Sequence, residues 1–224
     1  MALSHSISAV FIGWAALTLT CCANTRGETG VDASVTQDSA DGTEAKSTTP
    51  TDPDELDLLA PVGVCESAAA WFNVGFVLDA DTVTIDDGYP GSVRLLGVAA
   101  PEIAHGSKPA DCYGVKAWQT VKQWFPEGGS VPWLPEGAFV KVCSKPDPNA
   151  DDKDSFGRRL RYVYFKDGKG RSVQLNARVI RRGQGRLYRA FSSGLALEGL
   201  FAESEKAAQA EGLGGWKECS WTPL

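Results

Sequence analysis

Four side chains suited to acid–base and anion-binding chemistry lie within one short stretch of the chain. Two carboxylates, Asp79 and Asp81, open the stretch, and Arg94 and Glu102 close it. Between them are two runs rich in Val, Ile and Leu, separated by a segment of Asp-Gly, Pro and Gly that favours chain reversal. This pattern predicts a β-hairpin that brings the four side chains to one site. The alternative interpretation is an ordinary hairpin with solvated charges.

The elements around this hairpin predict an α+β domain. Strands come first and helices interleave late, without the regular alternation that a doubly wound fold requires. Five short strands, with a helix between the third and the fourth, predict a five-stranded OB-like Greek-key β-barrel with three helices. The predicted strands are 70–78, 81–86, 92–98, 138–143 and 160–165, and the predicted helices are 113–125, 173–182 and 195–209.

The first 60 residues differ in composition from the rest of the chain. Ile7–Leu19 is an apolar run too short for a comfortable membrane span, and the segment that ends it resembles a bacterial lipoprotein processing site. We therefore expect residues 1–22 to be an export signal, with Cys21 or Cys22 carrying a lipid. Residues 23–60 are polar and are expected to form a disordered linker to a domain at 61–224. The expected location is exported, as a membrane-anchored lipoprotein or a secreted protein of the periplasm or cell surface.

The charge of the chain is unevenly distributed. A net charge of −6 argues superficially against a nucleic-acid partner. Residues 1–61, however, hold nine acidic and two basic residues, which leaves 20 basic and 19 acidic residues for the rest. Residues 158–189 carry eleven Lys or Arg against one acid, Asp167. This basic band is compatible with a polyanionic ligand, and also with a solubilising surface.

Four segments, in order, resemble the staphylococcal nuclease (thermonuclease-like) family. Residues 79–83, Asp-Ala-Asp-Thr-Val, are similar to the family's Asp-Gly-Asp-Thr-Val. Residues 93–102, Val-Arg-Leu-Leu-Gly-Val-Ala-Ala-Pro-Glu, look like its Val-Arg-Leu-x-Gly-Ile-Asp-x-Pro-Glu. Residues 154–158, Asp-Ser-Phe-Gly-Arg, look like its Asp-x-Tyr-Gly-Arg, and residues 175–183 resemble its Val-Asn-x-x-Leu-(x)3-Gly segment. The match spans about residues 71–216 and implies the same fold.

The resemblance implies a calcium-dependent phosphodiesterase that hydrolyses DNA and RNA. Carried over to this sequence, Asp81 and the backbone carbonyl of Ala100 would bind Ca²⁺, and Glu102 would be the general base on the attacking water. Arg94 and Arg158 would hold the phosphate and stabilise the five-coordinate transition state. This chemistry is reasonable, because a negatively charged phosphodiester repels hydroxide unless guanidinium forks or a hard cation neutralise its oxygens.

The resemblance breaks at Ala99, where the family has a second metal-binding aspartate. Calcium affinity follows the number of charged ligands, so we expect a weakened calcium site. Asp79 is an additional candidate ligand, and Asp111 and His105 in the following loop are further alternatives.

Three aromatic residues, Phe156, Tyr188 and Phe191, are candidate nucleic-acid-binding residues. Phe156 stands where the family commonly has a tyrosine, and Phe191 falls near family tyrosines that stack on a base. A phenyl ring keeps the stacking surface and loses the hydroxyl.

Four cysteines lie in the predicted domain: Cys65, Cys112, Cys143 and Cys219. An even number in an exported domain indicates two disulfides, for which three pairings exist. Resemblance to related secreted nucleases implies the pair Cys112–Cys219, which leaves Cys65 with Cys143. A zinc site is not expected, because the chain has no Cys-x-x-Cys spacing in this domain and only two histidines.

Together these features predict an exported, metal-dependent nuclease that acts on DNA or RNA as a monomer, attached to a membrane only through its lipid. One alternative is a nucleic-acid-binding module of OB type that has lost turnover through Ala99. Another is an interaction module of a surface lipoprotein, whose basic band meets a protein or an anionic lipid.

Overall fold

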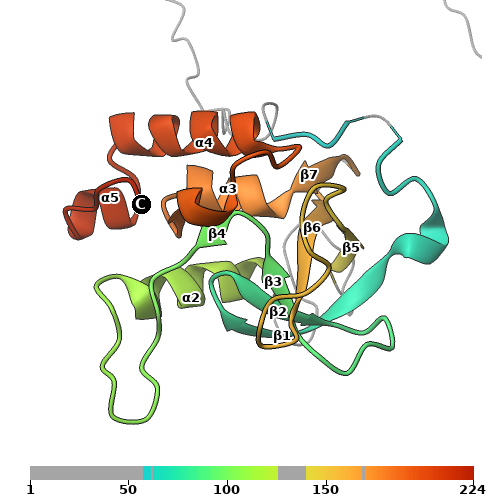
Figure 1. Ribbon diagram of the computed structural model, residues 1–224, viewed down its shortest axis with the longest axis horizontal. Helices are drawn as coiled ribbons and strands as arrows, with labels where there is room; N and C mark the ends of the chain where they lie inside the picture. The colour runs from blue at the N-terminus through green and yellow to red at the C-terminus, as the bar shows by residue number, and fades with distance from the viewer. Residues whose placement is uncertain (1–57, 62, 126–139, 168–169) are drawn as a thin grey trace, which may run out of the picture. The chain divides into compact units, whose positions relative to one another are not determined.

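The computed structural model describes residues 58–61, 63–125, 140–167 and 170–224 (Figure 1). The predicted export signal, the lipid-bearing Cys21 or Cys22 and the linker up to residue 57 lie outside these residues. In chain order the elements are the 3-10 helix η1 (Ala68–Ala70), the strands β1 (Phe72–Asp79), β2 (Thr82–Ile85), β3 (Val93–Leu95) and β4 (Val98–Ala99), the helix α2 (Gly114–Trp124), the strands β5 (Lys141–Lys145), β6 (Arg159–Lys166) and β7 (Ser172–Gln174), the helix α3 (Leu175–Arg181), the strand β8 (Arg186–Leu187), the 3-10 helix η2 (Arg189–Phe191), and the helices α4 (Glu198–Ala210) and α5 (Gly215–Glu218).

Five strands close into a ring. The main sheet has the order β3-β2-β1-β5-β6-β7, and β3 also pairs with β6. That last pairing is parallel, whereas the other neighbours are antiparallel. Strands β1, β2, β3, β5 and β6 thus form the five-stranded OB-type barrel that the sequence predicts, and β7 extends the sheet beyond it. The predicted hairpin is the pair β2–β3, in which Thr82 lies opposite Arg94.

A buried asparagine stabilises the region where β3 and β6 pair and close the ring. Asn176, fully buried at the start of α3, donates through Nδ2 to the carbonyls of Leu96 (2.9 Å) and Arg161 (3.0 Å). Its Oδ1 accepts the backbone N–H of Val163 at 3.0 Å. One side chain therefore satisfies backbone groups that follow β3 and lie within β6. This explains physically why an asparagine follows Leu175 in the sequence motif.

Gly97 makes the turn between β3 and β4. Its φ of 78° is unfavourable for a residue with a side chain, and a Cβ here would lie 2.8 Å from the ring of Phe201. Phe201 is fully buried on α4, which packs beside α3 over the barrel (Figure 1). The close packing of α4 on this turn fixes the direction of the chain between Arg94 and Glu102.

The structure differs from the predicted elements at several boundaries. The predicted strand 92–98 divides at Gly97 into β3 and β4, and β4 pairs with β8, which the sequence did not indicate. Residues 172–174 form β7, so the predicted helix 173–182 begins only at Leu175. Leu58, within the segment expected to be a linker, is buried, and its carbonyl accepts the N–H of Gln174 at 2.9 Å.

Two disulfides join the domain, Cys65–Cys143 and Cys112–Cys219. This is the pairing that the resemblance implied. The first links the segment before η1 to β5, and the second links the segment before α2 to the residue that ends α5. Across the described ranges, no helix has the length and apolar character needed to cross a membrane.

Candidate active site

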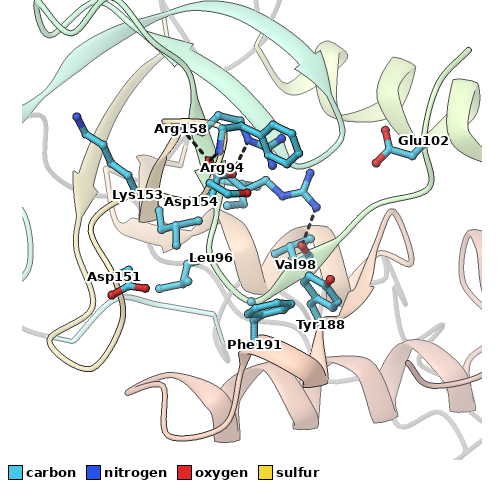
Figure 2. Close-up of a pocket in the computed structure, with 15 residues that line it drawn as sticks. Arg94, Leu96, Val98, Glu102, Asp151, Lys153, Asp154, Arg158, Tyr188 and Phe191 are labelled. Atoms are coloured by element: carbon cyan, nitrogen blue, oxygen red, sulfur yellow. Dashed lines mark hydrogen bonds and ion pairs between the residues drawn. The ribbon is translucent and has the colours of Figure 1, made fainter. Parts of the chain in front are cut away.

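A cavity of about 770 Å³ lies beside the β3–β4 turn, between that turn, the loop before β6 and the segment after β8 (Figure 2). It brings together six residues that the sequence singled out for catalysis or nucleic-acid binding, although they are spread over almost a hundred positions of the chain. These lining residues are Arg94, Glu102, Phe156, Arg158, Tyr188 and Phe191. Lys153, Ser155 and the carboxylates of Asp151 and Asp154 add to its polar lining.

Arg94 is held at the cavity by a buried carboxylate. Its Nη1 donates to Oδ1 of Asp81, which is only 1% exposed, and its Nη2 donates to the carbonyl of Val98 at 3.4 Å. Asp81 Oδ1 also accepts the hydroxyl of Thr82 at 3.0 Å. Asp81 Oδ2 accepts the backbone N–H of Ala100 at 2.7 Å. Burial raises the pKa of Asp81 well above its ordinary value, and the Arg94 guanidinium opposes that shift.

The groups that the resemblance assigned to calcium do not form a calcium site in the described residues. Asp81 already accepts three hydrogen bonds, from the Thr82 hydroxyl, the Arg94 guanidinium and the N–H of Ala100. Asp79 accepts the N–H of Asp81 at 2.9 Å. No cluster of three or more His, Cys, Asp or Glu side chains that could hold a metal occurs in the described ranges. Calcium prefers six to eight oxygen ligands with several carboxylates, so this donor set does not fit a resident ion.

Glu102 is positioned through its backbone. Its N–H donates to Oδ2 of Asp111 at 3.1 Å, and its carbonyl accepts the N–H of Asp111 at 2.9 Å. Gly114, at the start of α2, packs so closely that a Cβ there would lie 2.2 Å from the Glu102 carbonyl oxygen. Figure 2 shows the Glu102 carboxylate directed toward the side of the cavity that holds Arg94. Among the described residues that carboxylate has no hydrogen-bond or ion-pair partner, so it is available as a base.

Arg158 is held by the loop that precedes β6. Its Nε donates to Oδ2 of Asp154 at 2.6 Å, and its backbone N–H donates to Oδ1 at 3.0 Å. Burial alone would raise the pKa of Asp154, but the hydrogen bonds from Arg158 and from the N–H of Phe156 outweigh it and lower the pKa. Tyr89, in the β2–β3 turn, donates its hydroxyl to the carbonyl of Gly157 at 2.6 Å and so braces the same loop.

The three aromatic candidates lie exposed at the cavity. Phe156 is 83% exposed and Phe191 is 68% exposed, which is unusual for large apolar rings. The rings of Tyr188 and Phe191 lie 4.9 Å apart, centre to centre. Flat apolar faces beside two arginines suit stacking of nucleic-acid bases.

Three residues with structural roles at the site were missed or assigned differently. Asp111, considered from the sequence as a metal ligand, anchors the backbone of Glu102. His105, the other loop residue considered as a ligand, lies exposed in a small β-bridge with Lys108, outside the cavity. Asp154 was part of a quoted motif without a role, and its position four residues before Arg158 was the available signal. Buried Glu205 accepts the N–H of Leu187 and pairs with Arg189, on either side of Tyr188. No local sequence signal identifies it, because the contact is made between α4 and β8.

Comparisons with known proteins agree with this geometry. A family model described as "Staphylococcal nuclease homologue" matches residues 92–218, more than half of the chain. The chain is 28% identical over 148 residues to an uncharacterized protein of Methanocaldococcus jannaschii, covering 62% of this chain and 68% of the relative. It is 26% identical over 142 residues to the thermonuclease of Staphylococcus intermedius, covering 63% of this chain and 73% of the relative.

Proposed function

The chain belongs to the staphylococcal nuclease homologue family, and on that premise we propose that it hydrolyses phosphodiester bonds of DNA or RNA. The observation that carries the proposal is the convergence of Arg94, Arg158 and Glu102 on one cavity from three separate segments. The two guanidinium groups can neutralise the phosphate oxygens, and the carboxylate without a partner can act as the base on water.

In the proposed reaction the two guanidinium groups hold the non-bridging oxygens of the phosphate. Arg158 is tied through Nε, which leaves its Nη groups toward the cavity, and Arg94 is held by Asp81. Glu102 takes a proton from a water molecule as the water oxygen attacks phosphorus. The bond from phosphorus to the leaving oxygen breaks, and that oxygen takes a proton from solvent. The guanidinium charges stabilise the extra negative charge of the five-coordinate transition state.

Calcium enters this proposal only as an expectation from the family resemblance. The donor set around Asp81 does not fit a resident ion, so no step of the reaction is assigned to a metal. The positive charge that faces the phosphate comes from the protein itself, through Arg94 and Arg158.

The exposed rings of Phe156, Tyr188 and Phe191 favour single-stranded substrate. Bases can stack on protein rings only when they are not stacked in a duplex, and such stacking contributes about 1–3 kcal/mol per base. We therefore propose single-stranded DNA or RNA, or frayed ends, as the preferred substrate, bound by a monomer.

We also propose that the nuclease is exported and held at a membrane by a lipid. The support is the sequence of residues 1–22 and the two disulfides, which form and persist in oxidising compartments. Mass spectrometry of the mature protein is expected to find its N-terminus at Cys21 or Cys22 with a lipid attached. A mature chain that begins at Met1 would contradict this.

The test of the activity is hydrolysis of a single-stranded DNA oligonucleotide by the full chain and by Glu102→Gln. Loss of a general base is expected to lower kcat by about 10²–10⁴-fold, while the Kd for the oligonucleotide stays the same. Glu203→Gln is the matched control, because Glu203 lies exposed on α4 outside the cavity. Binding without hydrolysis in the native chain would instead favour a nucleic-acid-binding module.

A further inference from the structure

Asp81 makes the contacts of a residue that positions an arginine. Its carboxylate is buried and accepts three donors, from Arg94, Thr82 and Ala100. A buried carboxylate beside a guanidinium is a strong, directional pair, and its two oxygens fix both the guanidinium and the start of the segment that leads to Glu102. A metal ion at Asp81 would have to displace or share these bonds.

Position 99 strengthens this interpretation. β4 pairs with β8 so that Ala99 lies directly opposite Arg186. Directly opposed residues of an antiparallel pair project from the same face, so a methyl group and an arginine are neighbours where the resemblance expected an aspartate. Nε of Arg186 is buried without a hydrogen-bond partner. The guanidinium of Arg186 lies over the ring of Trp221 and donates through Nη1 to the carbonyl of Thr222 at 3.2 Å, so the residue opposite Ala99 supplies no carboxylate in place of the missing aspartate.

We infer that Asp81 is a positioning residue for Arg94 and that this chain binds nucleic-acid phosphate without calcium. The inference rests on the proposed function, since it concerns how the same cavity holds its substrate. It changes the role of Asp81 from metal ligand to a fixed counter-ion, and it assigns the cationic part of the site to arginine side chains.

The two possible roles of Asp81 predict different effects of Asp81→Asn on the affinity for single-stranded DNA in EDTA. If Asp81 orients Arg94, Asp81→Asn weakens binding of single-stranded DNA even in EDTA, because the guanidinium loses its orientation. If Asp81 serves only a metal, removing its negative charge in EDTA leaves the affinity unchanged or raises it, since a like charge near the phosphate is gone. Glu203→Gln is the matched control, because it removes a carboxylate charge on α4 outside the cavity.

The experiment measures the Kd of the full chain for a single-stranded DNA oligonucleotide in EDTA and in calcium, over a range of salt concentrations. We expect the same native Kd in both buffers, a loss of about tenfold on Asp81→Asn and no loss on Glu203→Gln. Arg94→Gln is expected to reduce the slope of log K against log[salt] by about 0.7, the value for one phosphate contact on a single strand. In the Arg94→Gln background, Asp81→Asn is expected to cause no further loss of DNA affinity, because Asp81 acts through Arg94. If Asp81 had only a structural role, the two losses of affinity would add.

Calcium alone supplies a second readout. Isothermal titration with Ca²⁺ is expected to show no binding by the native chain at millimolar concentration and measurable binding by Ala99→Asp, which adds a carboxylate beside Asp81. Calcium binding by the native chain, or DNA binding that disappears in EDTA, would overturn the inference. Intact DNA binding in EDTA without hydrolysis under any condition would overturn the proposed function alone. Absence of any DNA binding would overturn both.

Discussion

Removal of the Cys112–Cys219 disulfide tests how the base is positioned. Cys112 directly follows Asp111, whose side chain and backbone hold Glu102, and its disulfide partner ends α5. Without the disulfide, the described contacts of this segment with the C-terminal end are the exposed Lys116–Glu218 ion pair, a type of pair that contributes little, and the edge-to-face contact of Tyr113 with Trp221. We expect Cys112→Ala with Cys219→Ala to lower kcat for oligonucleotide hydrolysis about tenfold, equivalent to about 1.4 kcal/mol, with KM nearly unchanged because both arginines lie on other segments.

The second disulfide is a matched control for the loss of stability. The sequence separations are 107 for Cys112–Cys219 and 78 for Cys65–Cys143, which correspond to about 5 and about 4.5 kcal/mol of loop-closure entropy. Cys65 and Cys143 are also buried, whereas Cys112 is exposed, so their replacement leaves a cavity as well. Neither of them lines the active-site cavity. Removal of Cys65–Cys143 should therefore cost at least as much stability and leave kcat unchanged.

Two assays separate these effects. Urea unfolding reports the free energy of unfolding of each variant, and steady-state hydrolysis, at a temperature where both variants are fully folded, reports kcat and KM. Removal of Cys65–Cys143 is expected to cost at least as much stability as removal of Cys112–Cys219, whereas only removal of Cys112–Cys219 is expected to lower kcat. Equal losses of kcat in the two variants, or no loss on removal of Cys112–Cys219, would refute the argument that the disulfide holds the base in position.

Three further predictions concern single side chains. Asp111→Ala is expected to lower kcat about tenfold without changing the Kd for oligonucleotide, because one hydrogen bond to a charged acceptor is lost; Asp111→Asn, which keeps an acceptor oxygen, should restore most of the rate. Phe156→Ala and Phe191→Ala should each weaken binding of single-stranded DNA by about 1–3 kcal/mol in titrations, with a smaller effect on duplex DNA. The pKa of Asp154 is lowered in the folded state, so its contribution to stability is present above about pH 4 and is lost as the pH falls through the folded pKa. Melting temperatures of Asp154→Asn should consequently depend less on pH in this acidic range than those of the native chain, and an unchanged dependence would contradict the role of its bonds to Arg158.

Much of the fold was predictable because local patterns specify the strands of the barrel. The hairpin of β2 and β3 was evident from two apolar runs around a turn, and α2 from its apolar spacing. The pairs β4–β8 and β3–β6 were not predictable, because they join segments far apart in the chain. The start of α3 was misplaced because Ser172-Val173-Gln174, with one apolar residue between two polar ones, fits either element, and only pairing with β6 decides for a strand.

For the candidate site as well, the sequence indicated the catalytic residues but not the residues that position them. The motifs indicated that Arg94, Arg158 and Glu102 belong together, and the cavity brings them together. The motifs did not indicate their supports. Asp111 and Glu205 act through backbone groups of other elements, and a contact to a backbone N–H places no demand on the sequence at its partner position. Position 99 could be identified as a departure, but the arginine opposite it depends on the register of β4 and β8.

The side chain at position 99 decides between two kinds of phosphate site on one scaffold. The register of β2 and β3 sets Thr82 opposite Arg94, so Asp81 reaches the guanidinium whatever stands at position 99. The buried Asp81 carboxylate pairs with Arg94, and the half-buried carboxylate of Asp79 lies close enough to raise the pKa of Asp81. An aspartate at position 99 would add a third carboxylate beside one guanidinium, and the added negative charge would attract a divalent cation. With alanine, that third carboxylate is absent, and the affinity for phosphate then depends on salt through the arginines rather than on chelators.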